Sequence, residues 1–262
     1  MCSAGEASDV RAAAPNLAGR SCPYNSHMTP LRLLPFAAAD GPSNMAADEA
    51  MLEAAERGIA SLRFYTWTAP TLSLGYFQPS TVRLGWSQLP WVRRSTGGGA
   101  IVHHRELTYA LAVPAGSEWH TRESWICRFH RQIRDVLADA GVKVHTVICG
   151  EERKLGEGLC FLHQTPGDLL LGGSKIAGSA QRKRNGALLQ HGSILLSRSE
   201  FAPMLVGIDD FAGFTLHGPE RFAQVLAGTF SPEPGEWTAE ECLRIAAIRE
   251  LKYASPSWND KR

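Results

Sequence analysis

The stretch from Leu159 to Leu196 decides the fold, and it reads LCFLHQTPGDLLLGGSKIAGSAQRKRNGALLQHGSILL. Its apolar runs predict three strands, over residues 168–172, 175–181 and 187–196. The last two strands flank Asn185-Gly186, a dipeptide typical of two-residue hairpin turns because both residues tolerate positive φ. The stretch therefore predicts neighbouring antiparallel strands, and Cys160 and Lys175 lie beside or within them.

The chain on either side of this stretch predicts further strands and helices. Strands are predicted over residues 62–67, 71–75, 107–113 and 142–148, with the first two joined as a hairpin around Ala69-Pro70. Helices are predicted over residues 43–57, 122–140, 221–227 and 238–252. The first helix has Ser43 as its expected N-cap, and the last opens with Thr238-x-x-Glu241, a capping box.

Two of these helices also predict which side chains are buried. The helix over 122–140 carries an apolar stripe at helical spacing, formed by Ile126, Phe129, Ile133, Val136 and Ala140. The helix over 238–252 is expected to bury Cys242, Ile245 and Ile248. Because this C-terminal part is too small for a second core, residues 31–262 are expected to form one domain with a helical C-terminal tail.

Residues 1–30 are rich in Ala, Ser, Gly and Pro and lack the apolar segment of a secretory signal. We expect a flexible N-terminal extension, with a start codon placed too early or a transit peptide as the alternatives. Absence of a secretory signal, together with six cysteines that form no C-x-x-C pair, favours a cytoplasmic protein without a disulfide framework or zinc site.

The overall composition excludes several classes of function. The net charge is +1 and 44% of the 262 residues are hydrophobic, as in an ordinary globular protein. So small a charge argues against nucleic acid as the main partner. No apolar run approaches the roughly 18 residues that span a bilayer, so no membrane partner is expected.

The segment Thr96-Gly97-Gly98-Gly99-Ala100 is a candidate ligand loop, since glycines let backbone N–H groups approach a ligand closely. A plain turn is the alternative, and the spacing matches neither a Walker A loop nor a Rossmann fingerprint. His103 and His104 follow on an expected strand. Because successive side chains of a strand face opposite ways, at most one of the two histidines can face the loop.

Cys160 and Lys175 are the candidate reactive pair. A thiol becomes a strong nucleophile when a cation stabilises its thiolate, and two charges about 4 Å apart interact by roughly 4 kcal/mol at an effective dielectric near 20. Lys175 stands in an apolar strand, where lysine is uncommon. An exposed strand lysine and a buried, inert thiol are the alternatives, and residue spacing alone does not choose between them.

Several segments, taken together and in this order, resemble the lipoate/biotin protein ligase and octanoyltransferase superfamily. They are NMAAD (residues 44–48), WTAPTLSLG (67–75), RRSTGGGA (93–100), ELTY (106–109), GSKIAGSAQ (173–181) and QHGS (190–193). Cys160-Phe161, shortly before the Gly-x-Lys motif, is similar to the nucleophile position of the LipM-type octanoyltransferases. Where the family often has His-Asp, this chain has His103-His104.

The resemblance implies an α/β (α+β) fold, with a mixed, largely antiparallel sheet flanked by helices, like the catalytic domain of biotin and lipoate protein ligases. It implies Cys160 and Lys175 as catalytic residues, without cofactor or metal. The substrate-binding residues that it implies are Arg94, Gly97, Gly98, Gly99, Ala100, His104, Gly178, Ser179, Ala180, His191, Gly192 and Ser193.

The implied activity is that of an acyltransferase in protein lipoylation. Cys160 would take an octanoyl or lipoyl group from acyl carrier protein as a thioester and pass it to a lysine of a lipoyl-domain protein. Lys175 would stabilise the thiolate and help hold the substrate carbonyl, and backbone N–H groups at Gly97–Ala100 and Gly178–Ala180 would bind the oxyanion. The alternatives are an ATP-dependent lipoate ligase, an amidotransferase between lipoyl-domain proteins, and a non-enzymatic acyl-binding module.

Two further expectations concern how the substrates bind. Some of the aromatic residues Trp67, Tyr76 and Phe77 are expected to line the site for the eight-carbon chain, although the core of the protein is the simpler place for such residues. The turn Arg182–Arg184, or Arg93 and Arg94, is expected to attract an acidic protein partner, with a plain solvated turn as the alternative reading of the first group.

Overall fold

The computed structural model of the protein describes residues 30–116, 119, 122–211 and 218–262. The expected N-terminal extension over residues 1–30 lies outside this part except for its last residue. Within the described residues, no helix combines the length and the apolar character that crossing a membrane requires.

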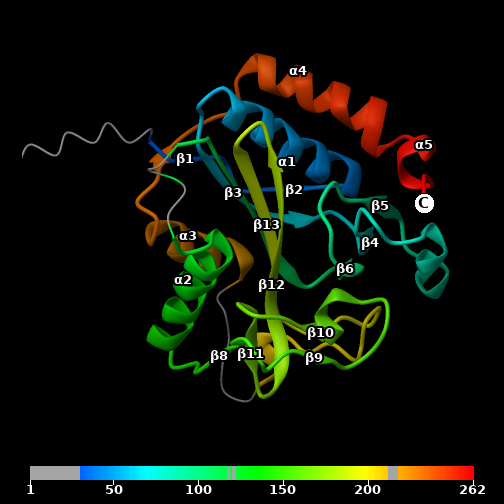
Figure 1. Ribbon diagram of the computed structural model, residues 1–262, viewed down its shortest axis with the longest axis vertical. Helices are drawn as coiled ribbons and strands as arrows, with labels where there is room; N and C mark the ends of the chain where they lie inside the picture. The colour runs from blue at the N-terminus through cyan, green and yellow to red at the C-terminus, as the bar shows by residue number, and fades with distance from the viewer. Residues whose placement is uncertain (1–29, 117–118, 120–121, 212–217) are drawn as a thin grey trace, which may run out of the picture.

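A nine-stranded sheet forms the centre of the molecule (Figure 1). Its order is β14 (Glu233–Pro234), β1 (Arg32–Leu33), β3 (Ser61–Trp67), β7 (Glu106–Val113), β13 (Ala187–Leu195), β12 (Ser174–Arg184), β11 (Leu169–Leu171) and β8 (His145–Thr146), with β2 (Ala37–Ala39) paired to β3. Every pair from β3 to β8 is antiparallel, whereas the pairs that involve β1, β2 or β14 are parallel. The predicted mixed, largely antiparallel sheet is confirmed.

The hairpin of β12 and β13 pairs eight residues of each strand, as many as β13 pairs with β7. Asn185 and Gly186 connect the strands with φ values of 49° and 83°, so the predicted Asn-Gly turn is confirmed. Ser179 pairs with Gly192 and Ala180 pairs with His191. The register therefore brings the GSKIAGSAQ and QHGS segments side by side.

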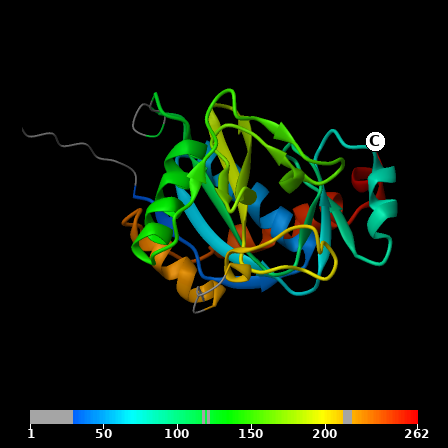
Figure 2. The ribbon, with the colours of Figure 1, turned by 90° about the horizontal axis from the view of Figure 1, so that it is seen from below.

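Helices cover both faces of the sheet (Figures 1 and 2). On one face, α1 (Gly41–Glu56) lies between the sheet and α4 (Ala239–Ile248), and it is therefore buried on nearly every side. It begins earlier than predicted, because Gly41-Pro42 can open a helix and Asp40, not Ser43, is the N-cap. The side chain of Asp40 accepts a hydrogen bond of 2.8 Å from the backbone N–H of Ser43.

On the other face, α2 (Trp125–Asp139) and α3 (Pro219–Gly228) pack against alternate residues of the same strands. Ser124 caps α2, which begins three residues later than predicted. The predicted stripe is partly wrong: the buried apolar residues recur every four positions, at Trp125, Phe129, Ile133 and Leu137. Ile126 and Val136 are only partly buried, and Ala140 is exposed. Of the predicted stripe, Phe129 and Ile133 therefore lie at the centre of the buried face, and the other three residues lie on its flank or outside it.

The C-terminal part follows α4 with a π-helical turn, η4 (Arg249–Tyr253), and a short helix, α5 (Pro256–Asn259). The predicted capping box is confirmed, since Thr238 and Glu241 exchange side-chain-to-backbone hydrogen bonds of 3.2 and 2.9 Å. The predicted burial of Cys242 is wrong, because its side chain is exposed. Glu241 is buried instead and pairs with Arg32.

A second, three-stranded sheet carries the glycine-rich loop. It has the order β5 (Trp91–Arg93), β4 (Thr71–Leu74) and β6 (Ile101–His103). The predicted hairpin around Ala69-Pro70 is therefore wrong: β3 stays in the main sheet, and β4 pairs with β5 and β6. Leu72 and Leu74 leave the main sheet because they pack in a separate apolar cluster with Ala100 and Val102.

Short elements complete the described fold. The pair β9 (Arg153–Lys154) and β10 (His163–Gln164) flanks the 3-10 turn η2 (Cys160–Leu162). Two further 3-10 turns are η1 (Ser80–Trp86) and η3 (Ile208–Asp210). The strand predicted over residues 142–148 is reduced to the two residues of β8.

Candidate active site

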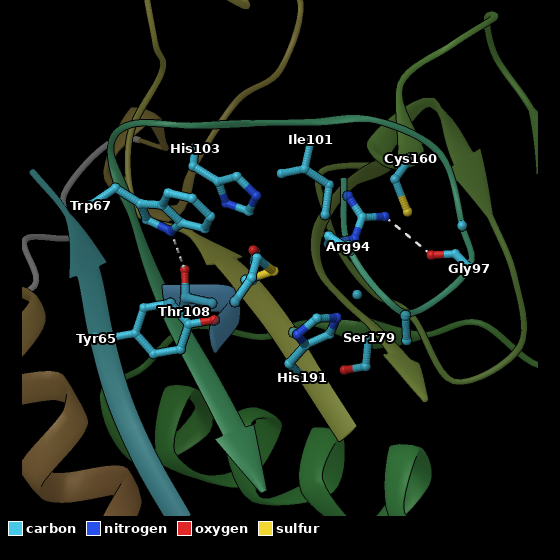
Figure 3. A pocket seen from close by; sticks show the side chains of 16 residues that line it. Tyr65, Trp67, Arg94, Gly97, Ile101, His103, Thr108, Cys160, Ser179 and His191 are labelled. Atoms are coloured by element: carbon cyan, nitrogen blue, oxygen red, sulfur yellow. Dashed lines mark hydrogen bonds between the residues drawn. The ribbon is translucent and has the colours of Figure 1, made fainter. Parts of the chain in front are cut away.

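A cavity lies where the main sheet, α1 and the glycine-rich loop meet, and its empty volume, including its mouth, is about 430 Å³ (Figure 3). Ten of the expected site residues line it together: Arg94, Gly97, Gly98, Cys160, Gly178, Ser179, Ala180, His191, Gly192 and Ser193. The rest of the wall, which the sequence did not point to as a group, consists of Met45, Tyr65, Trp67, Ile101, His103 and Thr108.

Cys160 opens η2 and is tied to the glycine-rich loop through its main chain. Its N–H donates to the carbonyl of Ala100, and the Ala100 N–H donates to the carbonyl of Gly158, both at 2.8 Å. A Cβ atom at Gly99 would lie 2.8 Å from the Cys160 nitrogen, so only glycine permits this approach. Gly99 and Ala100 therefore position Cys160, and the N–H of Ala100 is not free to bind an oxyanion.

Lys175 reaches Cys160 from β12. Its Nζ lies 3.9 Å from Sγ of Cys160, 3.0 Å from the carbonyl oxygen of His163 and 2.7 Å from Oδ2 of Asp168. A Cβ atom at Gly178 would lie 2.4 Å from Cε of Lys175, so the glycine makes room for the lysine side chain. Since an ammonium has three N–H donors, these three contacts leave none for a substrate carbonyl.

Asp168 is a functional candidate that the sequence reasoning missed. It is buried beside Lys175, and its Oδ2 also accepts hydrogen bonds from the backbone and side chain of Thr165, at 2.7 and 3.0 Å. Lys175 lies in β12 and Asp168 directly precedes β11, and these two apolar strands are joined at Gly172-Gly173, both with positive φ. The sequence pattern that could have indicated this pair is an Asp and a Lys on either side of a Gly-Gly turn, within otherwise apolar segments.

Arg94 carries a second positive charge to the cavity. Its guanidinium donates to the carbonyls of Ser73, Gly97 and Gly99, at 3.0, 3.1 and 2.9 Å, and to the Ser73 hydroxyl. Among the described residues, no carboxylate lies within ion-pair distance of it. A Cβ atom at Gly98 would lie 3.6 Å from Nη2 of Arg94 and 3.9 Å from Sγ of Cys160, so both groups face the same small space.

His103, not His104, lies in the cavity wall. Its Nδ1 is 2.5 Å from Oε1 of Glu106, its Nε2 is 2.6 Å from the hydroxyl of Ser73, and its ring stacks on Trp67. Burial lowers the pKa of His103. His104 faces the opposite way, as strand alternation requires, and it contacts Ser199 outside the cavity. The structure therefore does not bring His104 to the expected site.

His191 is held by a buried network that extends from β13 to α1. Its Nδ1 lies 2.8 Å from Oδ2 of Asp48, and its Nε2 lies 2.7 Å from the hydroxyl of Thr96. Asp48 also forms a buried ion pair with Arg63. Burial alone would raise the pKa of Asp48, but Arg63 and His191 outweigh it, and the pKa is lowered. An ionised Asp48 thus fixes the orientation of the His191 ring.

The Ser179 hydroxyl is held by two buried side chains. Its hydroxyl is bonded to the hydroxyl of Tyr109 and lies 2.6 Å from Nε2 of His130, a buried residue of α2. Burial raises the pKa of Tyr109 and lowers the pKa of His130, so both groups are neutral near pH 7. Ser179 thus forms part of the cavity wall, and its role in substrate binding stays a prediction.

Of the three aromatic residues expected at the site, only Trp67 lines the cavity. Tyr76 packs against Trp258, and Phe77 is 71% exposed. The basic turn is partly engaged within the protein, since Arg182 donates to the carbonyl of Ser95 and Arg184 pairs with Glu56, whereas Lys183 is exposed. Attraction of an acidic partner to this turn stays a prediction. Arg93 and Arg94 are buried, and Arg93 donates to the carbonyl of Asn259 at 2.8 Å.

The arrangement is suited to acyl transfer through a covalent intermediate. A thiol stands at a cavity whose other wall is largely apolar, and two cations, Lys175 and Arg94, face it. Cations near a thiol favour its nucleophilic thiolate form. The cavity can take an apolar group bound to the sulfur, since Met45, Trp67 and Ile101 belong to its wall.

Comparisons with known proteins agree with this geometry. A family model described as the lipoyl protein ligase A/B catalytic domain matches residues 40–212. The octanoyltransferase LipM of Kyrpidia tusciae is 32% identical, and the alignment covers 88% of this chain and 98% of that protein. The octanoyltransferase LipM of Symbiobacterium thermophilum is also 32% identical, with the same two coverages.

Solved structures share the fold at lower identity. A lipoate-protein ligase A bound with ATP superposes with a TM-score of 0.70 at 20% identity, covering 87% of this chain and 98% of that one. A bipartite lipoate protein ligase from Thermoplasma acidophilum superposes with a TM-score of 0.64, also at 20% identity, covering 89% and 97%. These likenesses concern the fold, and they confirm the ligase-like architecture that the sequence motifs implied.

Proposed function

Because this chain belongs to the lipoyl protein ligase A/B catalytic domain family, and relatives that match most of its length are octanoyltransferases, we propose that it transfers octanoyl groups from acyl carrier protein to lipoyl domains. It is an acyltransferase of protein lipoylation. The proposal includes acyl carrier protein as the donor, a lipoyl domain as the acceptor and a thioester at Cys160 as the covalent intermediate. The observation that carries them is the 3.9 Å contact between Lys175 and Cys160 at the wall of an apolar cavity.

In the first half-reaction, the Cys160 thiolate attacks the carbonyl carbon of the octanoyl thioester. A carbon–sulfur bond to Cys160 forms, and the bond to the thiol of the carrier breaks. The ammonium of Lys175 and the guanidinium of Arg94 support this step, because both hold positive charge beside the reacting sulfur. Exchange of one thioester for another is nearly balanced in energy, so the step needs no ATP.

In the second half-reaction, the amine of the acceptor lysine attacks the Cys160 thioester. The amide forms as the bond to Sγ breaks, the proton that the amine loses passes to the departing sulfur of Cys160, and the change from thioester to amide is downhill. A lipoyl domain is the acceptor that family membership supports, since the bipartite ligase of Thermoplasma acidophilum was studied with its E2 lipoyl domain. Two protein partners would thus use the same Cys160 in turn.

The octanoyl chain would occupy the cavity beside Cys160. Met45, Tyr65 and Trp67 form its wall on α1 and β3, and Trp67 is the one of the expected aromatic residues among them. Burial of an apolar chain is favourable by about 0.8 kcal/mol for each methylene. A lipoyl chain has the same eight-carbon backbone, and transfer of a lipoyl group between proteins is the related alternative.

The test is intact-protein mass spectrometry after the enzyme is mixed with octanoyl-acyl carrier protein. We expect the wild-type enzyme to gain one octanoyl group, and we expect Cys160→Ala to gain none. Added lipoyl domain should then remove the group from the enzyme and carry it. An enzyme that stays unmodified, and that modifies the lipoyl domain only with ATP and free lipoate, would refute the proposal in favour of a ligase.

A further inference from the structure

Most polar side chains of the cavity wall are already hydrogen-bonded within the protein, and among the described lining residues only Nε of Arg94, on the Cys160 side, is buried without a partner. Figure 3 shows Cys160 and Gly97 on one side of the cavity, with Tyr65, Trp67 and Thr108 on the other. On that far side, the indole N–H of Trp67 donates to the hydroxyl of Thr108 at 2.9 Å. The Tyr65 hydroxyl donates to Asp48 at 3.0 Å. A chain bound to Cys160 therefore meets ring faces and methyl groups there, rather than free donors.

The same pairing extends along the rest of the wall. The hydroxyls of Thr108 and Ser193 both donate to Oε1 of Glu106, at 2.6 and 3.0 Å. Both ring nitrogens of His103 have partners, and so do both ring nitrogens of His191. Among the described side chains of this far wall, each N–H and O–H donor is thus already used inside the protein.

We propose that this self-paired wall makes the enzyme selective for acyl chains that end in an apolar group, and that the Thr108–Trp67 hydrogen bond determines this selectivity. The inference rests on the proposed function, because it concerns the acyl chain carried by Cys160. Acyl chains with a terminal hydroxyl, carboxylate or ureido group are refused. Such a group would lose its hydrogen bonds to water and find no free side-chain donor in the far wall.

Thr108 offers a substitution that changes the pairing and hardly changes the volume. Valine has nearly the same size as threonine but no hydroxyl, so Thr108→Val leaves the indole N–H of Trp67 without an acceptor. A terminal hydroxyl on the acyl chain can then accept that hydrogen bond. The substitution should therefore admit a polar chain end without enlarging the cavity.

The experiment compares two acyl carrier protein thioesters of equal length, nonanoyl and 8-hydroxyoctanoyl, with octanoyl as the reference. The readout is the rate at which Cys160 is acylated, measured by intact-protein mass spectrometry. For the wild-type enzyme we expect 8-hydroxyoctanoyl to react about 10- to 100-fold more slowly than nonanoyl. In Thr108→Val the ratio of the nonanoyl rate to the 8-hydroxyoctanoyl rate should decrease at least about fivefold. Thr146→Val, on β8 at the edge of the sheet, is the matched control and should keep the wild-type ratio.

The outcomes separate the two proposals. An enzyme that never accepts octanoyl refutes the proposed function itself. An enzyme that accepts octanoyl, but takes 8-hydroxyoctanoyl as fast as nonanoyl, overturns the selectivity and leaves the function intact. A large wild-type ratio that Thr108→Val does not change overturns the assignment to Thr108 and Trp67. Should Thr108→Val fail to fold, the wild-type ratio alone decides whether the wall excludes polar chain ends.

Discussion

Removal of one partner of the Lys175–Asp168 ion pair should destabilise the protein far more than removal of both. Nζ lies 2.7 Å from Oδ2, and the two side chains are 3% and 5% exposed. An unpaired charge there still carries the free-energy cost of desolvation but no longer gains the attraction of its partner. Breaking a buried ion pair in this way costs about 3–5 kcal/mol. Lys175→Met should therefore lower the free energy of unfolding by about 3–5 kcal/mol, or the melting temperature by roughly 6–20 °C.

The assay is a double-mutant cycle in urea, with Lys175→Met, Asp168→Asn and the combined variant. The combined variant should lie within about 2 kcal/mol of the wild type, because no unpaired charge remains buried. The exposed pair of Arg249 and Asp40 is the control, and the same cycle there should show a coupling below about 1 kcal/mol. Additive costs at Lys175 and Asp168 would refute the reasoning.

The same variants distinguish an effect on the stability of the fold from an effect on the acylation of Cys160. The combined variant should regain stability but not octanoyl transfer, since Cys160 no longer has an ammonium 3.9 Å from its sulfur. At an effective dielectric near 20, that contact is worth roughly 4 kcal/mol before solvent and Asp168 reduce it. We expect acylation of Cys160 to slow by about 10- to 100-fold, and a combined variant that acylates at the wild-type rate would exclude Lys175 from the chemistry.

Three further predictions concern the loop, the pH dependence and the chain length. Gly99→Ala should slow acylation of Cys160 by on the order of 10²-fold, because its Cβ would lie 2.8 Å from the Cys160 nitrogen. Gly85→Ala, where a Cβ meets nothing within 4 Å, should match the wild type in the same mass-spectrometric assay. Burial lowers the pKa of His103 and His130 below the ordinary 6.5, so below that pH the unfolded chain binds more protons than the folded one. The free energy of unfolding, measured in urea, should decrease as the pH is lowered from about 6.5, by up to about 1.4 kcal/mol per pH unit for each histidine. A free energy of unfolding that stays constant from pH 7.5 to 5.5 would contradict this. Met45→Ala should raise the rate with decanoyl relative to octanoyl thioester, by about fourfold for each further methylene that the space admits, and an unchanged ratio would remove Met45 from the chain-binding wall.

The sequence predicted best those features that depend on local chemistry. The turn at Asn185-Gly186 requires positive φ at both residues, and the cap at Thr238 and Glu241 is made within one helical turn. Each of these two sequence patterns lies within a segment of no more than four residues. Most of the candidate cavity could also be predicted, because family motifs named ten of the residues that line it.

The errors arise where distant parts of the chain decide the outcome. Two strands around Ala69-Pro70 look like a hairpin, but the apolar cluster of Leu72 and Leu74 places the second strand in another sheet. Strand alternation allowed only one of His103 and His104 to face the loop, yet it could not say which. That choice depends on Trp67, which stacks on His103 from a different strand.

The main-chain attachment of Cys160 has a consequence for how such enzymes can diverge. The backbone hydrogen bond from its N–H to Ala100 does not involve its side chain, so another residue could take the position while the loop keeps its path. The acyl cavity, by contrast, is built largely on the sheet and α1. Evolution could therefore exchange the nucleophile while inheriting the cavity unchanged, and a protein engineer could install a different reactive group at position 160 for the same reason.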